Sequence, residues 1–122
     1  MTEDHIVSII DDDASVRVAL ESLVRSLGYS ARTYDSAEAF LQSGNCDQTS
    51  CIVTDVQMTG MSGLDLQSRL KAAGCVVPTI LITAFPDDHV RARAVAEGAF
   101  AFLAKPFDGQ ALVGLLTAAI EH

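Results

Sequence analysis

Residues 6–13 read IVSIIDDD, an apolar run that ends in three adjacent acids. The run is typical of a buried strand. At a separation of roughly 4 Å and an effective dielectric constant near 20, two carboxylates repel each other by about 4 kcal/mol. A single acid is enough to cap a following helix and to interact with its dipole, an effect of about 0.3 to 1 kcal/mol. The sequence therefore predicts that a positive charge offsets the crowding of Asp11, Asp12 and Asp13.

Five short apolar runs alternate with longer stretches of helical periodicity, which is the pattern of a parallel sheet with crossover helices. Four of the runs are nearly continuous in apolar or small residues, as in strands covered on both faces, whereas residues 29–34, YSARTY, are polar and predict an edge strand. The predicted strands are residues 5–10, 29–34, 50–55, 78–83 and 99–104.

The stretches between these strands carry helix signals. Apolar residues between 16 and 27 recur at spacings of three and four, and Gly28 follows them as a helix end. Asp35 and Glu38 resemble a capping box that opens a short second helix ending near Gly44. Further helix boundaries are predicted at Ser62, at Pro86 or Asp87, and at Gly98, and the last helix carries its apolar stripe over residues 112–120.

Length and composition predict one soluble domain over residues 1–122. The chain is 49% hydrophobic and 20% charged, and its net charge of −8, with only two lysines and six arginines, argues against direct nucleic-acid binding. No apolar run approaches the roughly 20 residues of a membrane-spanning helix, and the first residues are acidic. We expect a cytoplasmic protein that does not bind membranes.

The three cysteines are an odd set without a C-x-x-C pair, so the sequence predicts neither a disulfide framework nor a thiolate metal site. The expected role of Cys46, Cys51 and Cys75 is that of small buried side chains.

Polar side chains gather where the predicted strands end. Asp11 and Asp12 end the first strand, Asp55 ends the third, Thr83 ends the fourth, and Lys105 follows the fifth. Open α/β sheets bind ligands outside these carboxyl ends. In a flavodoxin-like (βα)5 doubly wound fold, with a five-stranded parallel sheet in the order 2-1-3-4-5, Asp55 is central and Lys105 is long enough to reach it.

Clustered carboxylates without thiolate or imidazole partners favour Mg²⁺, which offsets their repulsion. Each residue also has a simpler interpretation, since Thr83 alone reads as a strand-end hydroxyl bonded to the backbone and Lys105 alone as a solvated charge. The complete set carries more weight than its members because lysine is so scarce in this chain.

The residues resemble a known family, the response-regulator receiver domains of two-component signalling in the CheY-like superfamily. The resemblance covers essentially the whole chain, and the wording of its motifs is most similar to the FixJ-type subgroup. The matching pieces are IIDDD at 9–13, VTDVQMTGMSG at 53–63, ILITA at 80–84 and FLAKPF at 102–107. Members of that subgroup usually carry a C-terminal helix-turn-helix output domain, which this chain lacks, so it is either a stand-alone receiver or part of a longer regulator.

The resemblance implies that Asp55 is the phosphoacceptor, which takes a phosphoryl group from a sensor histidine kinase. It also implies a Mg²⁺ or Mn²⁺ ion bound by Asp12, the Asp55 carboxylate and the backbone carbonyl of Gln57, with Asp11 acting mainly through water. On this interpretation the chain catalyses its own phosphorylation, with its dephosphorylation left open, and is not a turnover enzyme.

The resemblance further implies a switch. Thr83 would bond to the phosphoryl group and Phe102 would rotate into the vacated space, while Lys105 neutralises charge and is aimed by a cis bond before Pro106. Partners would read the face of the fourth helix, fifth strand and fifth helix: an output domain or a separate effector, in transcription regulation, with a phosphorylation-dependent homodimer as a further possibility.

Two features depart from the family pattern. Thr59 follows Met58 where a proline is common, so a rigid element of that loop is missing. Residues 84–86, Ala-Phe-Pro, are bulkier and stiffer than the small residues often found after the switch threonine, which predicts a shorter travel of the switch or a start nearer one state.

Two alternatives stay open. The chain is alternatively a constitutive, phosphorylation-independent binding module with the receiver fold. A remote alternative is a haloacid-dehalogenase-type phosphatase, because Asp11, Asp13 and Ser15 follow a strand in D-x-D-x-S spacing. In those enzymes the lysine precedes the late acidic pair, whereas Lys105 follows residues 87–88. A flavodoxin that binds flavin is disfavoured, since its phosphate would meet three carboxylates.

Overall fold

The computed structural model describes residues 5–121, which form five strands and five α-helices. The strands are β1 (Ile6–Ile10), β2 (Ser30–Tyr34), β3 (Cys51–Asp55), β4 (Thr79–Thr83) and β5 (Ala101–Ala104). The helices are α1 (Ala14–Ser26), α2 (Ala37–Ser43), α3 (Gly63–Ala72), α4 (Asp88–Ala96) and α5 (Gly109–Glu121), with a 3-10 helix, η1 (Cys46–Gln48), before β3. Each predicted strand is present, and each ends at the predicted residue.

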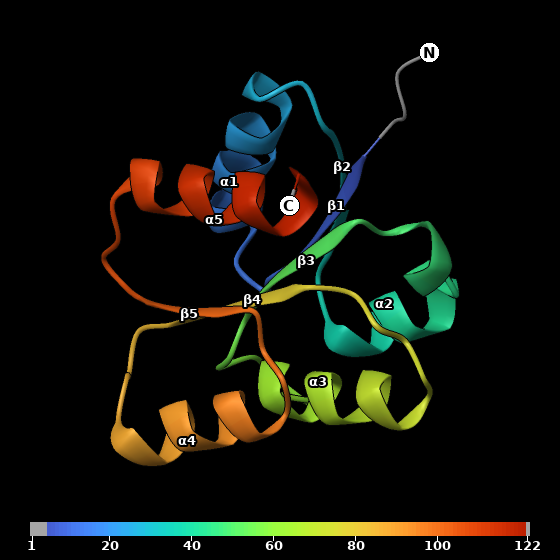
Figure 1. The fold of residues 1–122 in the computed structure, drawn as a ribbon, viewed down its shortest axis with the longest axis vertical. Helices are drawn as coiled ribbons and strands as arrows, with labels where there is room; N and C mark the ends of the chain where they lie inside the picture. Colours follow the sequence, from blue (N-terminus) through green and yellow to red (C-terminus); the bar gives the residue numbers. More distant parts are fainter. Residues whose placement is uncertain (1–4, 122) are drawn as a thin grey trace.

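The sheet is parallel throughout, and its order, β2-β1-β3-β4-β5, confirms the predicted topology. Helices α1 and α5 cover one face, and α2, α3 and α4 cover the other (Figure 1). Because β3 lies between β1 and β4, the register places Ile10 beside Thr54 and Asp55 beside Ile82. The carboxyl ends of β1, β3 and β4 therefore meet at one edge of the sheet.

Alternation along the central strands divides the core into layers. Val7 and Ile9 pack with α1 and α5, whereas Ile10 and Ile52 face Phe40 of α2 on the opposite side. Burying a side chain of this size contributes about 1.5 to 3 kcal/mol relative to leaving it exposed. This burial on both faces fixes the strand ends that carry the polar residues.

The two edge strands differ from the centre. All five residues of β3 and of β4 are buried, whereas every residue of β2 is exposed or half-buried, as expected of the predicted edge strand. The prediction that β5 is covered on both faces holds, because Ala101 and Leu103 pack on the side of α1 and α5 and Phe102 packs on the side of α4. All four residues of the strand are nevertheless only half-buried. The physical reason is its position, since β5 has a neighbouring strand on one side alone.

The start of α2 also departs from the prediction. Its N-cap is Ser36, whose Oγ accepts a hydrogen bond of 3.0 Å from the backbone N–H of Ala39, and not Asp35. The Glu38 carboxylate does not close a capping box but accepts a bond of 3.1 Å from the N–H of Met61, in the loop after β3. The helix ends at Gly44, as predicted, with a left-handed backbone at φ 67°.

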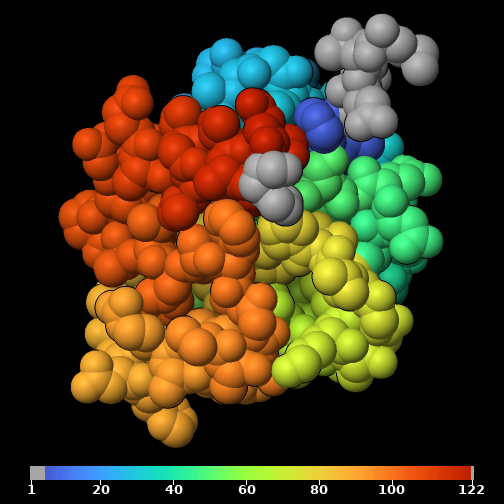
Figure 2. Space-filling view, viewed as in Figure 1, coloured from blue at the N-terminus to red at the C-terminus, as the bar shows by residue number. Residues whose placement is uncertain are grey.

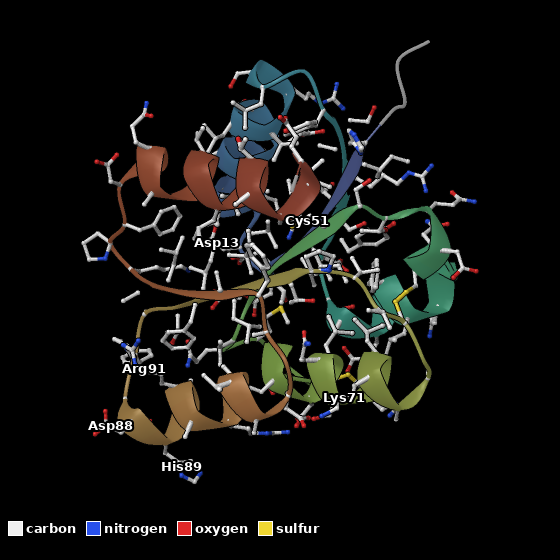
Figure 3. All side chains as sticks on the ribbon, in the orientation of Figure 1. Asp13, Cys51, Lys71, Asp88, His89 and Arg91 are labelled. Atoms are coloured by element: carbon white, nitrogen blue, oxygen red, sulfur yellow. A yellow bond between two sulfur atoms is a disulfide. The ribbon has the colours of Figure 1, made fainter. Side chains whose placement is uncertain are left out.

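Two of the three cysteines form a disulfide, which contradicts the prediction of isolated cysteines. Cys46 of η1 and Cys75 of the loop before β4 are paired, with their Cα atoms 6.4 Å apart (Figure 3). The pairing depends on the fold bringing two distant loops together, so no local spacing reveals it. Cys51 matches its prediction, because it is fully buried and burial raises the pKa of its thiol to about 12.

Reduction of this disulfide is expected to lower the free energy of unfolding by about 3 to 4 kcal/mol, because the bridge closes a loop of 29 residues in the unfolded chain. Urea unfolding followed by circular dichroism, with and without reductant, measures the change. A Cys46→Ser/Cys75→Ser variant should not respond to reductant; a response of the same size would show that the reductant does not act through this disulfide.

Gly63 allows α3 to start directly against the end of β3. Its N–H donates to the Val56 carbonyl at 3.0 Å, and a Cβ at this position would overlap the Asp55 carbonyl oxygen. We expect Gly63→Ala to lower the free energy of unfolding by about 1 to 3 kcal/mol, because backbone must move.

The matched control is Gly114→Ala in α5, where an added Cβ meets open space. This substitution should raise the free energy of unfolding by about 0.5 to 1 kcal/mol through helix propensity. The same urea titration compares both variants, and a Gly63→Ala protein as stable as the wild type would contradict the packing argument.

Candidate functional site

The strand order brings the predicted polar residues to one edge of the sheet. Asp11 follows β1, Asp55 is the last residue of β3, Thr83 is the last residue of β4, and Lys105 follows β5. The first three are almost completely buried, at 2%, 7% and 0% exposure. Such burial of charged and polar groups is expensive unless each has a partner.

Asp55, at the end of β3, and Lys105, after β5, form an ion pair past the end of β4, which lies between these two strands. The Nζ of Lys105 lies 3.0 Å from Oδ2 of Asp55, and the other carboxylate oxygen accepts a bond of 3.3 Å from the N–H of Gln57. Burial lowers the pKa of Lys105, but the hydrogen bond and charge of Asp55, with further acids nearby, outweigh it and raise this pKa. The bond between Lys105 and Pro106 is cis, as the resemblance predicts.

The three acids after β1 have three different environments. Asp13 caps α1 and accepts from the N–H of Ser15 at 2.8 Å, so the simple structural interpretation holds for this residue (Figure 3). Asp11 is buried and accepts from the N–H of Asp13 at 2.9 Å. Asp12 is exposed, and its Oδ2 accepts from the N–H of Thr59 at 3.0 Å.

Burial raises the pKa of Asp11 to about 6. The bond from the Asp13 N–H and the charge of Lys105 oppose this rise, whereas the charges of Asp55 and Asp12 add to it. The repulsion expected from the sequence is therefore present, and Asp11 feels both neighbouring carboxylates.

Thr83 is linked to Gln57, a contact that sequence reasoning missed. The Thr83 hydroxyl donates to Oε1 of Gln57 at 2.7 Å and accepts from the N–H of Phe85 at 3.0 Å. The family resemblance implies only a backbone role for Gln57. A polar side chain two residues after Asp55 is the signal that could have found it.

Phe102 lies half-buried on β5 and packs against the cluster of Leu81, Val56 and Ala94. The guanidinium carbon of Arg91, on α4, lies 5.0 Å from the centre of the Phe102 ring. Figure 3 shows Arg91 directed towards the sheet, away from the solvent-facing His89 of the same helix. Such a contact is worth about 0.5 to 1 kcal/mol at an exposed position, and it was not predicted.

The donor atoms fit a small hard cation. No group of three or more His, Cys, Asp or Glu side chains within residues 5–121 is arranged as a metal cage. Magnesium needs no such cage, because it binds through one or two carboxylates and keeps several waters. The acids around Asp11 supply oxygen ligands and leave negative charge that Lys105 alone does not balance.

Comparison with known proteins identifies the family of the chain. The response regulator receiver domain matches residues 7–117. The chain belongs to this family. Its fold superimposes on the crystal structure of FixJ-N with a TM-score of 0.87 and 32% sequence identity, over 99% of this chain and 97% of the other.

Curated relatives of the receiver include response regulator protein TodT of Pseudomonas putida, which is 40% identical over 95% of this chain. Nodulation protein W of Bradyrhizobium diazoefficiens is 42% identical over 96% of it. The chain spans about half the length of these relatives, 51% and 52% respectively. The receiver is thus homologous to one part of longer two-component response regulators.

The raised pKa of Asp11 makes stability depend on pH. Folding raises the pKa of Asp11 from an ordinary 3.8 to about 6, so the folded protein holds this proton more tightly than the unfolded chain. The stability that the proton contributes at low pH is therefore lost as the pH rises between these two values. We expect Asp11→Asn to be more stable than the wild type by about 1 to 3 kcal/mol at pH 7 in EDTA, and equally stable near pH 4.

Urea unfolding at the two pH values measures this difference. Asp47→Asn, at an exposed residue of η1, is the matched control and should show no comparable gain. An Asp11→Asn gain that persists undiminished at pH 4 would contradict the assignment to this proton.

Proposed function

We propose that this receiver accepts a phosphoryl group from the phosphohistidine of a sensor histidine kinase onto Asp55, in a reaction that needs Mg²⁺ or Mn²⁺. The observation that carries the proposal is the placement of the buried Asp55 carboxylate between Asp11, the Lys105 ammonium group and the Thr83 strand end. A carboxylate with a lysine at 3.0 Å is ready to attack phosphorus and to have its new charge neutralised.

The transfer needs no general base. An oxygen of the Asp55 carboxylate attacks phosphorus, a P–O bond forms and the P–N bond to the kinase histidine breaks, with the electron pair returning to the imidazole nitrogen. Lys105 then pairs with the phosphoryl oxygens, and the N–H of Gln57 holds the carboxylate during attack. Positioning and charge neutralisation supply most of the catalysis in such transfers.

The divalent cation would be held by Asp12, the Asp55 carboxylate and the Gln57 carbonyl, with Asp11 acting through water. When bound, it neutralises negative charge on the carboxylates and on the transferred group. Asp11 and Asp12 come from the turn after β1, and the other two ligands come from the end of β3. The meeting of these two strand ends is what makes a shared cation site feasible.

The switch would start from the bond between Thr83 and Gln57. A phosphoryl group on Asp55 offers the Thr83 hydroxyl a stronger, charged acceptor than the Gln57 amide oxygen. Thr83 would exchange partners, the loop after β4 would move with it through the bond from the Phe85 N–H, and Phe102 would repack against α4. Phosphorylation shifts this equilibrium by the difference of these contacts between the two states.

An apolar groove beside the site offers a place for the kinase. It has a volume of about 660 Å³ and lies between α1 and the loop after β5, lined by Val16, Leu20, Pro106 and Phe107 as well as by Lys105. A kinase helix that docks its apolar side chains here would bring its phosphohistidine close to Asp55. The groove thus joins partner recognition to the acceptor.

The output surface would be the face of α4, β5 and α5. Figure 2 shows the surface of the α4–β5 segment adjoining that of α5 on one side of the molecule. Relatives with the names transcriptional regulatory protein TdiR and FixJ are about twice as long as the matched region. We propose that the receiver controls a DNA-binding output domain or a separate effector in transcription regulation, with a phosphorylation-dependent homodimer through this face.

The receiver would act in the cytoplasm as a signalling phosphoprotein, without turnover of a separate substrate. No helix within residues 5–121 is long and apolar enough to cross a membrane. The net charge of −8 supports contact with nucleic acid through an output domain instead of through this surface.

Intact-mass spectrometry after incubation with acetyl phosphate and Mg²⁺ tests the function. We expect one added phosphoryl group on the wild type, none on Asp55→Asn and none in EDTA, with Asp47→Asn as the matched control that behaves like the wild type. A wild-type chain that binds the cation but gains no phosphoryl group would favour the constitutive binding module. Multiple turnover of acetyl phosphate at a rate typical of enzymes would favour a phosphatase.

A further inference from the structure

The loop after β3 is held by two carboxylates that come from different elements. Asp12, after β1, accepts from both the N–H and the hydroxyl of Thr59, at 3.0 and 3.3 Å. Glu38, in α2, accepts from the N–H of Met61 at 3.1 Å. Thr59 thus lies in the loop between β3 and α3 and donates hydrogen bonds to a carboxylate of the proposed cation site.

We propose that Thr59 is a positioning residue for the divalent cation. Thr59 holds one oxygen of Asp12 and so fixes the orientation of this metal-binding carboxylate. The inference rests on the proposed function, since it concerns the same site. Thr59 stands where a proline is common in the family, and a proline has no backbone N–H to donate to Asp12.

Both Thr59 bonds end on the same oxygen of Asp12. They reach Oδ2, and no hydrogen bond from another residue within 5–121 reaches Oδ1. Two donors on one oxygen restrict rotation of the carboxylate and leave the second oxygen free for a cation. Because Asp12 is exposed, it has little packing to hold it, so these bonds are its main restraint.

Hydrogen bonds to a metal-binding carboxylate normally strengthen metal binding, and their loss costs 10- to 100-fold in affinity. Thr59 contributes one strong and one longer bond, so the cost should depend on which donor is removed. The Thr59 hydroxyl, at 3.3 Å, is the weaker donor. The backbone N–H, at 3.0 Å, is the stronger donor, and only proline removes it.

Direct Mn²⁺ binding, measured by electron paramagnetic resonance on the unphosphorylated protein, tests the inference. We expect Thr59→Ser to bind like the wild type, Thr59→Val to bind about 2- to 3-fold more weakly, and Thr59→Pro about 10-fold more weakly. Thermal unfolding in EDTA checks that all variants are folded.

Glu38→Gln is the matched control, because it weakens the other tether of the same loop without touching Asp12. This variant should bind Mn²⁺ within 2-fold of the wild type; an equal loss would assign the effect to loop order and overturn the inference. A Thr59→Pro protein that binds Mn²⁺ as tightly as the wild type, or more tightly, would overturn it alone. A wild type that binds no Mn²⁺ would overturn the proposed cation site and the inference together.

Discussion

Negative charge crowded at the carboxyl ends of β1 and β3 is the constraint on which the rest of the structure depends. The sheet order forces Asp11 and Asp55 together, and burial of both prevents water from screening them. Lys105, which follows β5, partly neutralises this charge by pairing with Asp55, and a backbone N–H group donates a hydrogen bond to each of the two carboxylates. The proposed binding of a cation and of a phosphoryl group would use the same unbalanced arrangement, so the features that make this edge costly would also make it reactive.

The part of the fold that could be predicted from sequence is the part that local pattern determines. Continuous apolar runs ended by polar residues identified the strands and, with them, the common edge of Asp55, Thr83 and Lys105. The topology followed because parallel strands joined by helices allow few arrangements. Partial exposure of β5 could not be read in this way, since an edge strand with an apolar sequence has the same pattern as a central one.

The missed contacts share a physical cause: each depends on where a side chain points after the backbone has folded. Gln57 and Thr59 lie in a loop whose sequence carries no period, and Glu38 satisfied a capping pattern yet turned to that loop instead. The bond between Cys46 and Cys75 joins two such loops. Strand-end chemistry is set by the sheet, whereas these partners are set by loop conformation, which short-range sequence rules do not capture.

The disulfide lies near the amino ends of the strands, at the opposite end of the sheet from Asp55, because Cys46 precedes β3 and Cys75 precedes β4. The remaining thiol, Cys51, is fully buried, and burial raises its pKa to about 12. All three native cysteines are therefore poor targets for maleimides or spin labels. A single cysteine introduced on an exposed turn of α4 would carry a probe selectively, and the proposed movement of the output surface could be followed by spectroscopy without removal of any native thiol.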